Sequence, residues 1–136
     1  MIQDTVAPPG TDSYKRIQVD GVRYYGKHLI LTGMGCNDAL LSKETMVDFL
    51  KTLADRIDMV RFGEPLVERF GEGIEEGISG VQLIQTSALV THTNDQARDL
   101  YLDVFSCKDF EAEAVMAYVR EVYAPANIEF QVFLRK

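Results

Sequence analysis

The sequence predicts an α+β domain built as a two-layer sandwich, in which two helices pack on one face of an antiparallel sheet. Two segments space their apolar residues as amphipathic helices do, and several others have the composition of strands. Their order along the chain is strand, helix, several strands, helix, strand. At 136 residues the chain is long enough for one domain with a single core.

The clearest helix lies in the first half of the chain. Val22–Gly33 is rich in aromatic and aliphatic residues and predicts a strand before it. The segment 41–60 predicts the helix, with Ser42 as its N-cap, because a serine oxygen can accept a hydrogen bond from a free backbone N–H. One apolar face follows helical spacing, at Met46, Phe49, Leu50, Leu53 and Ile57. A second strand is expected within 59–70, interrupted by turn-forming residues.

The second half of the chain predicts mainly strands. The stretch 71–80 contains four glycines and three glutamates, which predicts a flexible loop. It lacks the lysine of a phosphate-binding loop, and its acids would repel phosphate. Further strands are expected at 81–93, 98–107 and 127–135, and a second helix at 110–123. In 98–107 the apolar residues alternate, which places Leu100, Leu102, Val104 and Ser106 on one face of the sheet.

Domain boundaries follow from the N-terminal composition. Residues 1–20 are expected to form a flexible tail, because Pro8, Pro9 and Gly10 interrupt regular structure and no periodicity appears. Residues 21–136 are expected to form a single domain. The N-terminus lacks the basic and apolar regions of a signal peptide, so a cytoplasmic location is expected.

Composition excludes several classes of partner. The net charge is −7 and no basic stripe is present, which argues against nucleic acid and anionic membrane surfaces. No apolar stretch approaches the roughly 20 residues of a membrane-spanning helix. The two cysteines, Cys36 and Cys107, are too few and too distant to indicate a disulfide scaffold.

Four residues stand out as candidates for chemistry: Ser79, Ser87, His92 and Cys107. Taken singly, each has an ordinary structural interpretation, as a turn residue, a satisfied hydroxyl, a surface histidine and a small buried side chain. A Ser-His hydrolase is disfavoured, because no G-x-S-x-G elbow surrounds Ser87 and no acid partner can be assigned. The histidines and cysteines do not show the ligand spacing of a zinc site, so no metal is expected.

Taken together, the four residues form an ordered pattern. S-G-V at 79–81, T-S at 86–87, H-T at 92–93 and D-V-F-S-C at 103–107 follow one another with short gaps. This pattern resembles the bacterial S-adenosylmethionine decarboxylases, pyruvoyl enzymes that carry S-G-V, E-S-H, I-H-T and D-x-F-T-C in the same order. G-K-H-L at 26–29 is similar to the family's G-R-H-L, so the resemblance extends from Gly26 onward.

The resemblance implies that the chain is a proenzyme of polyamine biosynthesis. Ser87 would attack the carbonyl of Thr86, the chain would be cut between these residues, and Ser87 would become a pyruvoyl group. Ser79 and His92 would assist the processing. The pyruvoyl carbonyl would form a Schiff base with a small amino-acid-type substrate and accept electrons during decarboxylation, and Cys107 would reprotonate the product carbon. A homodimer is also implied.

Several positions depart from the family pattern. Thr86 replaces a glutamate, Ala88 replaces a histidine, and Asn94-Asp95-Gln96 replaces Trp-Pro-Glu. In the family, that glutamate holds the substrate ribose, and Gln96 could imitate it only weakly. Phe70 is the nearest candidate for the aromatic residue that stacks on adenine.

Two alternatives follow from these departures. One is a decarboxylase for a different substrate, such as a basic amino acid, held by an acidic loop with Glu72, Glu75, Glu76 and Asp95. The other is a non-processed homologue with a regulatory or structural role.

Overall fold

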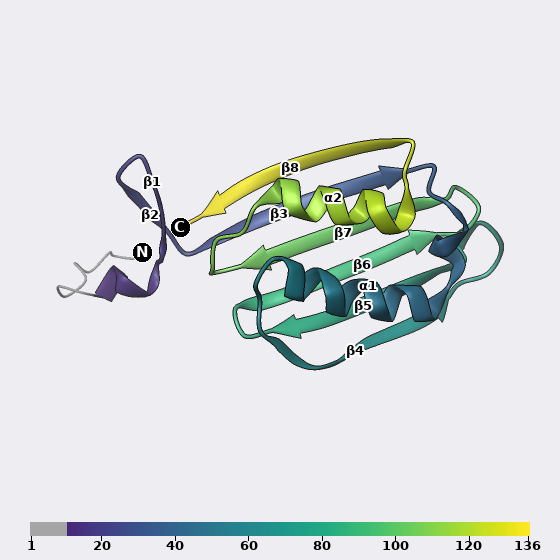
Figure 1. The fold of residues 1–136 in the computed structure, drawn as a ribbon, viewed down its shortest axis with the longest axis horizontal. Coiled ribbons are helices and arrows are strands. Elements are labelled where there is room, and N and C mark those ends of the chain that lie inside the picture. Colours follow the sequence, from purple (N-terminus) through teal and green to yellow (C-terminus); the bar gives the residue numbers. More distant parts are fainter. Residues whose placement is uncertain (1–10) are drawn as a thin grey trace, which may run out of the picture.

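The computed structural model describes residues 11–136. Within them, one six-stranded antiparallel sheet has the strand order β4-β5-β6-β7-β3-β8, and both helices lie on the same face of it (Figure 1). The predicted fold class, a two-layer α+β sandwich, is therefore confirmed. The opposite face of the sheet is not covered by any described element and is called the open face below.

The helices and strands of the sheet have the following bounds. The sheet strands are β3 Gly26–Met34, β4 Arg61–Phe70, β5 Gly77–Ile84, β6 Ser87–Asn94, β7 Asp99–Ser106 and β8 Asn127–Arg135. The helices are α1 Lys43–Arg56 and α2 Ala112–Tyr123. Short 3-10 helices lie at Asp38–Leu41 and Gly73–Glu75.

The core lies between the helices and the sheet, as the apolar periodicity predicts. Ser42 caps α1 by accepting a hydrogen bond from the backbone N–H of Thr45 at 3.1 Å. In β7 the predicted inner residues are all fully buried: Leu100, Leu102, Val104 and Ser106. The two helices meet through Phe49 of α1, whose ring stacks on Tyr118 at a centroid distance of 5.4 Å and meets the edge of Tyr123 at 5.0 Å.

The glycine-rich segment is partly strand, which the sequence does not predict. Only residues 71–76 form a loop, and β5 begins at Gly77. A Cβ atom at Gly80 would lie 2.8 Å from Met46 Sδ and 2.9 Å from Leu50 Cδ1, and one at Gly77 would overlap the carbonyl of Thr93. These two glycines therefore allow β5 to pack closely against α1 and β6. The composition alone had indicated a flexible loop in this segment.

Two predicted strands are each divided. Val22–Gly33 is interrupted at Tyr25, which separates β2 (Val22–Tyr24) from β3. The segment 81–93 is divided by a tight turn at Gln85-Thr86, which lacks the glycine, proline or asparagine that marks most turns. Ser87 is therefore the first residue of a strand and not an interior one.

Regular structure begins before residue 21. Residues 1–10 lie outside the described residues, but Thr11–Tyr14 form a 3-10 turn and β1 (Ile17–Val19) pairs with β2 as a hairpin. Ile17 is buried, with an exposed fraction of 3%. The part of the expected tail that the structure describes thus contains secondary structure.

Candidate active site

The Thr86-Ser87 peptide lies in the turn between β5 and β6. Ser87 has a φ of 155°, which residues other than glycine rarely adopt. Backbone strain of this kind costs about 1–3 kcal/mol and is maintained only where the surrounding structure enforces it. Here the enforcement comes from both sides, since Ser87 pairs with Ile84 of β5 and with Ser106 of β7.

The carbonyl of Thr86 is polarised by a backbone donor. The N–H of Cys107 donates a hydrogen bond to Thr86 O at 3.1 Å. Cys107 directly follows β7, which places it beside the turn that contains Ser87. A fixed N–H aimed at a carbonyl oxygen stabilises negative charge that develops on that oxygen during attack on the carbon.

Ser106 anchors the same turn, a role that the sequence pattern alone does not predict. Its hydroxyl donates to Thr86 Oγ1 at 2.8 Å and accepts from the backbone N–H of Lys108 at 2.9 Å. Ser106 is fully buried. The available signal was the alternation of β7, which places this polar side chain on the buried face, where a hydroxyl needs a hydrogen-bond partner.

Ser79 and His92 form a hydrogen-bonded pair on the open face. Ser79 Oγ and His92 Nδ1 are 2.8 Å apart, and the two residues are paired in register on β5 and β6. His92 is exposed, whereas its neighbours Thr91 and Thr93 are buried. The pair therefore points away from the helices.

The pair is distant from Ser87 in the same chain. His92 lies five residues after Ser87 on β6, which at the rise of a strand is a separation of roughly 16 Å. The structure thus brings Thr86, Ser87 and Cys107 together at one end of the sheet, called the cleavage end. Ser79 and His92 lie toward the other end, called the dyad end.

The three predicted substrate-binding residues lie at the dyad end. Phe70 ends β4 and pairs with Gly77, Glu76 precedes β5, and Gln96 is exposed in the turn after β6. Phe70 and Ser79 line one small hollow of about 90 Å³, and Phe70 is 60% exposed. The hollow therefore places an available aromatic ring close to the Ser79–His92 pair.

The acidic groups at this end already have a cation. Arg69 contacts Glu76 Oε2 at 3.2 Å and the carboxylate of Asp95, and it donates to the carbonyl of Leu41 at 2.8 Å. Two of the four acids that could have received a basic substrate are thereby neutralised. This arrangement weakens the interpretation of the loop as a receptor for a cationic side chain.

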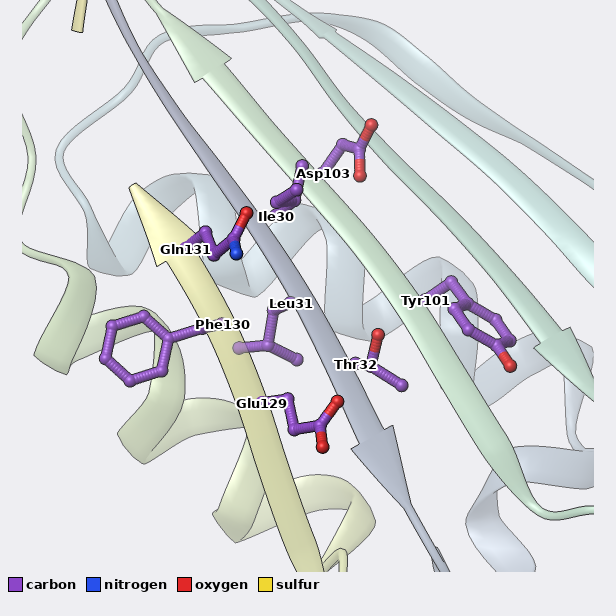
Figure 2. A pocket seen from close by; sticks show the side chains of 8 residues that line it. All are labelled: Ile30, Leu31, Thr32, Tyr101, Asp103, Glu129, Phe130 and Gln131. Carbon is purple, nitrogen blue, oxygen red and sulfur yellow. The ribbon is translucent and has the colours of Figure 1, made fainter. Parts of the chain in front are cut away.

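A larger cavity of about 490 Å³ lies on the open face over β3, β7 and β8. Figure 2 shows its lining, with the helices behind the sheet: Ile30, Leu31, Thr32, Tyr101, Asp103, Glu129, Phe130 and Gln131. It includes none of the residues that the sequence identified as candidates for chemistry. In the described residues, no group of three or more His, Cys, Asp or Glu could hold a metal ion.

The two cysteines differ in their surroundings. Cys36 is buried, and this burial, together with the nearby carboxylate of Asp99, raises the pKa of its thiol from the ordinary 9.0 to about 11. Cys107 is half-buried, and its sulfur accepts a hydrogen bond from Arg16 Nη2 at 3.3 Å. Cys36 is therefore a neutral core residue at physiological pH, and Cys107 is the cysteine that belongs to the cleavage end.

We expect the chain to lose stability as the pH rises from 9 to about 11. The thiol of Cys36 ionises at lower pH in the unfolded chain than in the folded one, so the folded state is penalised within this window. The loss from this group is at most about 3 kcal/mol. Urea titrations at pH 8 and pH 11 should show a smaller fall for Cys36→Ala than for the wild type. Burial, with the nearby Cys36 thiol as a second cause, also raises the pKa of Tyr123, so Cys36→Ala lowers the Tyr123 contribution in the same direction. Equal falls in the two proteins would contradict the assignment.

The fold and the site define a class, a two-layer α+β protein with an open sheet face and a serine, histidine and cysteine on adjacent strands. The model of the S-adenosylmethionine decarboxylase family matches residues 27–136, and the chain belongs to this family. The fold also matches the crystal structure of the adenosylmethionine decarboxylase from Aquifex aeolicus VF5, with a TM-score of 0.71 and 23% identity, over 84% of this chain and 92% of that chain.

The structural match supports the fold alone at this identity. No curated protein sequence matches the chain. Among the described residues, none of the helices is long and apolar enough to cross a membrane.

Proposed function

We propose that this chain is a pyruvoyl-dependent decarboxylase that acts on S-adenosylmethionine, generates its prosthetic group from Ser87 and works as a homodimer. The observation that carries the proposal is the hydrogen bond from the Cys107 N–H to the Thr86 carbonyl at 3.1 Å, next to a serine with strained backbone. The family supports decarboxylation as the reaction class.

Self-cleavage would begin with attack of Ser87 Oγ on the carbonyl carbon of Thr86. The Cys107 N–H would stabilise the developing oxyanion, and Ser106 would hold the Thr86 side chain still. Collapse breaks the C–N bond and leaves an ester with a free amine. Removal of the Ser87 α-proton then expels the Thr86 carboxylate and leaves dehydroalanine. Proton transfer to its β-carbon gives an imine, and addition of water to the imine releases ammonia. The strain at Ser87 is relieved when the peptide bond breaks, which favours the forward direction.

The residues at the cleavage end fit a pyruvoyl group at position 87. When present, the group supplies a carbonyl that binds the substrate amine and accepts electrons as carbon dioxide leaves. Cys107 follows the strand residue that pairs with Ser87, so its thiol is available to return a proton to the substrate carbon.

The separation between the two ends supports the homodimer. A group roughly 16 Å from Ser87 cannot remove its α-proton. If two chains pack by their open faces about a twofold axis, the dyad end of one chain can face the cleavage end of the other. The open face also exposes large apolar side chains that a monomer would leave in water, including Phe62 (67%), Leu66 (68%), Leu83 (50%) and Val90 (41%).

The dyad end supports a nucleoside substrate over a basic amino acid. Phe70 offers an exposed ring for stacking beside the Ser79–His92 pair. Arg69 already occupies the carboxylates of Glu76 and Asp95. Gln96 lies in the turn at this end, from which it can donate a hydrogen bond to a sugar hydroxyl.

The direct test is the release of labelled carbon dioxide from carboxyl-labelled S-adenosylmethionine, arginine and lysine. The proposal expects turnover of S-adenosylmethionine and none with Ser87→Ala. Turnover of arginine or lysine alone would overturn the substrate assignment. No turnover of any amino acid by a chain that is not cut would favour the regulatory or structural homologue.

We expect Phe70→Ala to raise KM for S-adenosylmethionine about 5- to 10-fold, because a ring stack is worth about 1 kcal/mol beyond the area it buries. Ile74→Ala is the control, since Ile74 is an exposed apolar side chain in the loop before β5 and does not line the hollow with Ser79. Steady-state kinetics of both variants give the comparison. An equal rise in KM for both would show that the hollow is not the nucleoside site.

A further inference from the structure

We propose that Arg16 is a positioning residue that holds the sulfur of Cys107 and stabilises its thiolate, so that a segment before the matched family region takes part in the chemistry. The inference rests on the proposed function of Cys107 as proton donor. Arg16 Nη2 donates to Cys107 Sγ at 3.3 Å, although the two residues are 91 positions apart in the sequence. The family match begins only at residue 27.

The segment that carries Arg16 is fixed to the cleavage end of the sheet. The next residue, Ile17, is buried and pairs with Tyr24 in the β1–β2 hairpin. Tyr25 then donates its backbone N–H to the carbonyl of Arg135 at 2.6 Å, and its ring lies 6.3 Å from that of Phe105. Figure 1 shows the hairpin at the end of the sheet where β7 terminates. Arg16 is itself exposed, and the packing of the hairpin that follows it holds it next to the cysteine.

Other charged side chains near Cys107 form their contacts with residues other than this cysteine. Lys108 Nζ contacts Asp58 Oδ2 at 3.0 Å, and Asp109 Oδ1 accepts from Lys27 Nζ at 3.1 Å. On neighbouring strands, the guanidinium of Arg135 lies over the ring of Phe105 at 4.8 Å, and Asp103 faces His28 at 3.7 Å. Among the described residues, Arg16 is the charged side chain that is hydrogen-bonded to the sulfur.

A cation at this place suits a cysteine that gives up a proton. When the S–H bond breaks and the proton goes to the substrate carbon, the electron pair stays on sulfur as a thiolate. A guanidinium within hydrogen-bond distance stabilises that anion and limits the rotation of the thiol. The hydrogen bond of Arg16 is to the sulfur, so its proposed role is exerted through Cys107.

The test is the rate of thiol alkylation by iodoacetamide at pH 7, read by mass spectrometry at Cys107. We expect Arg16→Gln to lower this rate about threefold, with Arg16→Lys recovering part of it. Arg23→Gln is the matched control, because Arg23 belongs to the same hairpin but donates to the carbonyl of Lys15. Cys36 does not react near neutral pH, because its thiol is buried.

The experiment separates this inference from the proposed function. Alkylation is measured on the uncut Ser87→Ala chain and on the wild type, so it does not require decarboxylation. A lower alkylation rate in Arg16→Gln, with Arg23→Gln unchanged, supports the role of Arg16 even if no carbon dioxide is released. An unchanged rate in Arg16→Gln, or an equal fall in Arg23→Gln, overturns it. In an active enzyme, the kcat of Arg16→Gln should also fall and that of Arg16→Lys should recover.

Discussion

Cys107→Ala is expected to lose decarboxylase activity by about 10²- to 10⁴-fold while the chain is still cut before residue 87. The two effects separate because the residue contributes two different groups. Its thiol is the proposed proton donor, whereas its backbone N–H polarises the Thr86 carbonyl at 3.1 Å, and alanine keeps this N–H. Carbon dioxide release and the intact mass of the denatured protein measure the two effects independently.

Cys36→Ala is the matched control for this prediction. Cys36 is buried in the core and lies in the loop after β3, so its removal should change stability and leave the reaction rate within about twofold. If Cys107→Ala kept full decarboxylase activity, the thiol would not be the proton donor. If Cys107→Ala also blocked cleavage in a folded protein, the thiol, and not the N–H alone, would be needed for processing.

Coexpression of His92→Ala and Ser87→Ala chains is expected to restore cleavage that neither variant shows alone. In a mixed dimer, Ser87 of the first chain meets His92 of the second, so one complete site forms. The His92→Ala chain should be the one that is cut. The physical reason is the separation of roughly 16 Å between His92 and Ser87 within one chain. Different affinity tags on the two chains identify the fragments by mass.

The matched control coexpresses two variants that each lack one residue of the dyad end. His92→Ala with Ser79→Ala should not restore cleavage, because every site in that mixed dimer lacks one member of the hydrogen-bonded pair. Cleavage of His92→Ala by itself would show that the pair is not needed. Absence of rescue in mixed dimers that are shown to form would contradict the shared site.

The buried residues of the helices and strands were predictable from the sequence, because the spacing of apolar residues along an element follows from which of its sides is buried. The alternation of β7 and the helical spacing of α1 both give the observed buried residues, including Leu102 and Phe49. The same alternation explains why the Ser79–His92 pair is on the open face. These predictions need only local geometry.

Several features of the site depend on contacts between distant segments, which no local pattern reports. Gly80 is required by the approach of α1 and not by a loop. The turn at Gln85-Thr86 has no turn-forming residue, so the position of Ser87 at the start of β6 was not predicted. Arg16 reaches Cys107 through a hairpin that lies before the family motifs.

The central claim is that the chain cuts itself before Ser87, and the intact mass of freshly purified, denatured protein tests it most directly. We expect two fragments, with the break between Thr86 and Ser87 and with the C-terminal fragment carrying a pyruvoyl group in place of its serine. Ser87→Ala should give a single species near 15.3 kDa. A single species of this mass for the wild type, unchanged after prolonged incubation, would contradict the claim.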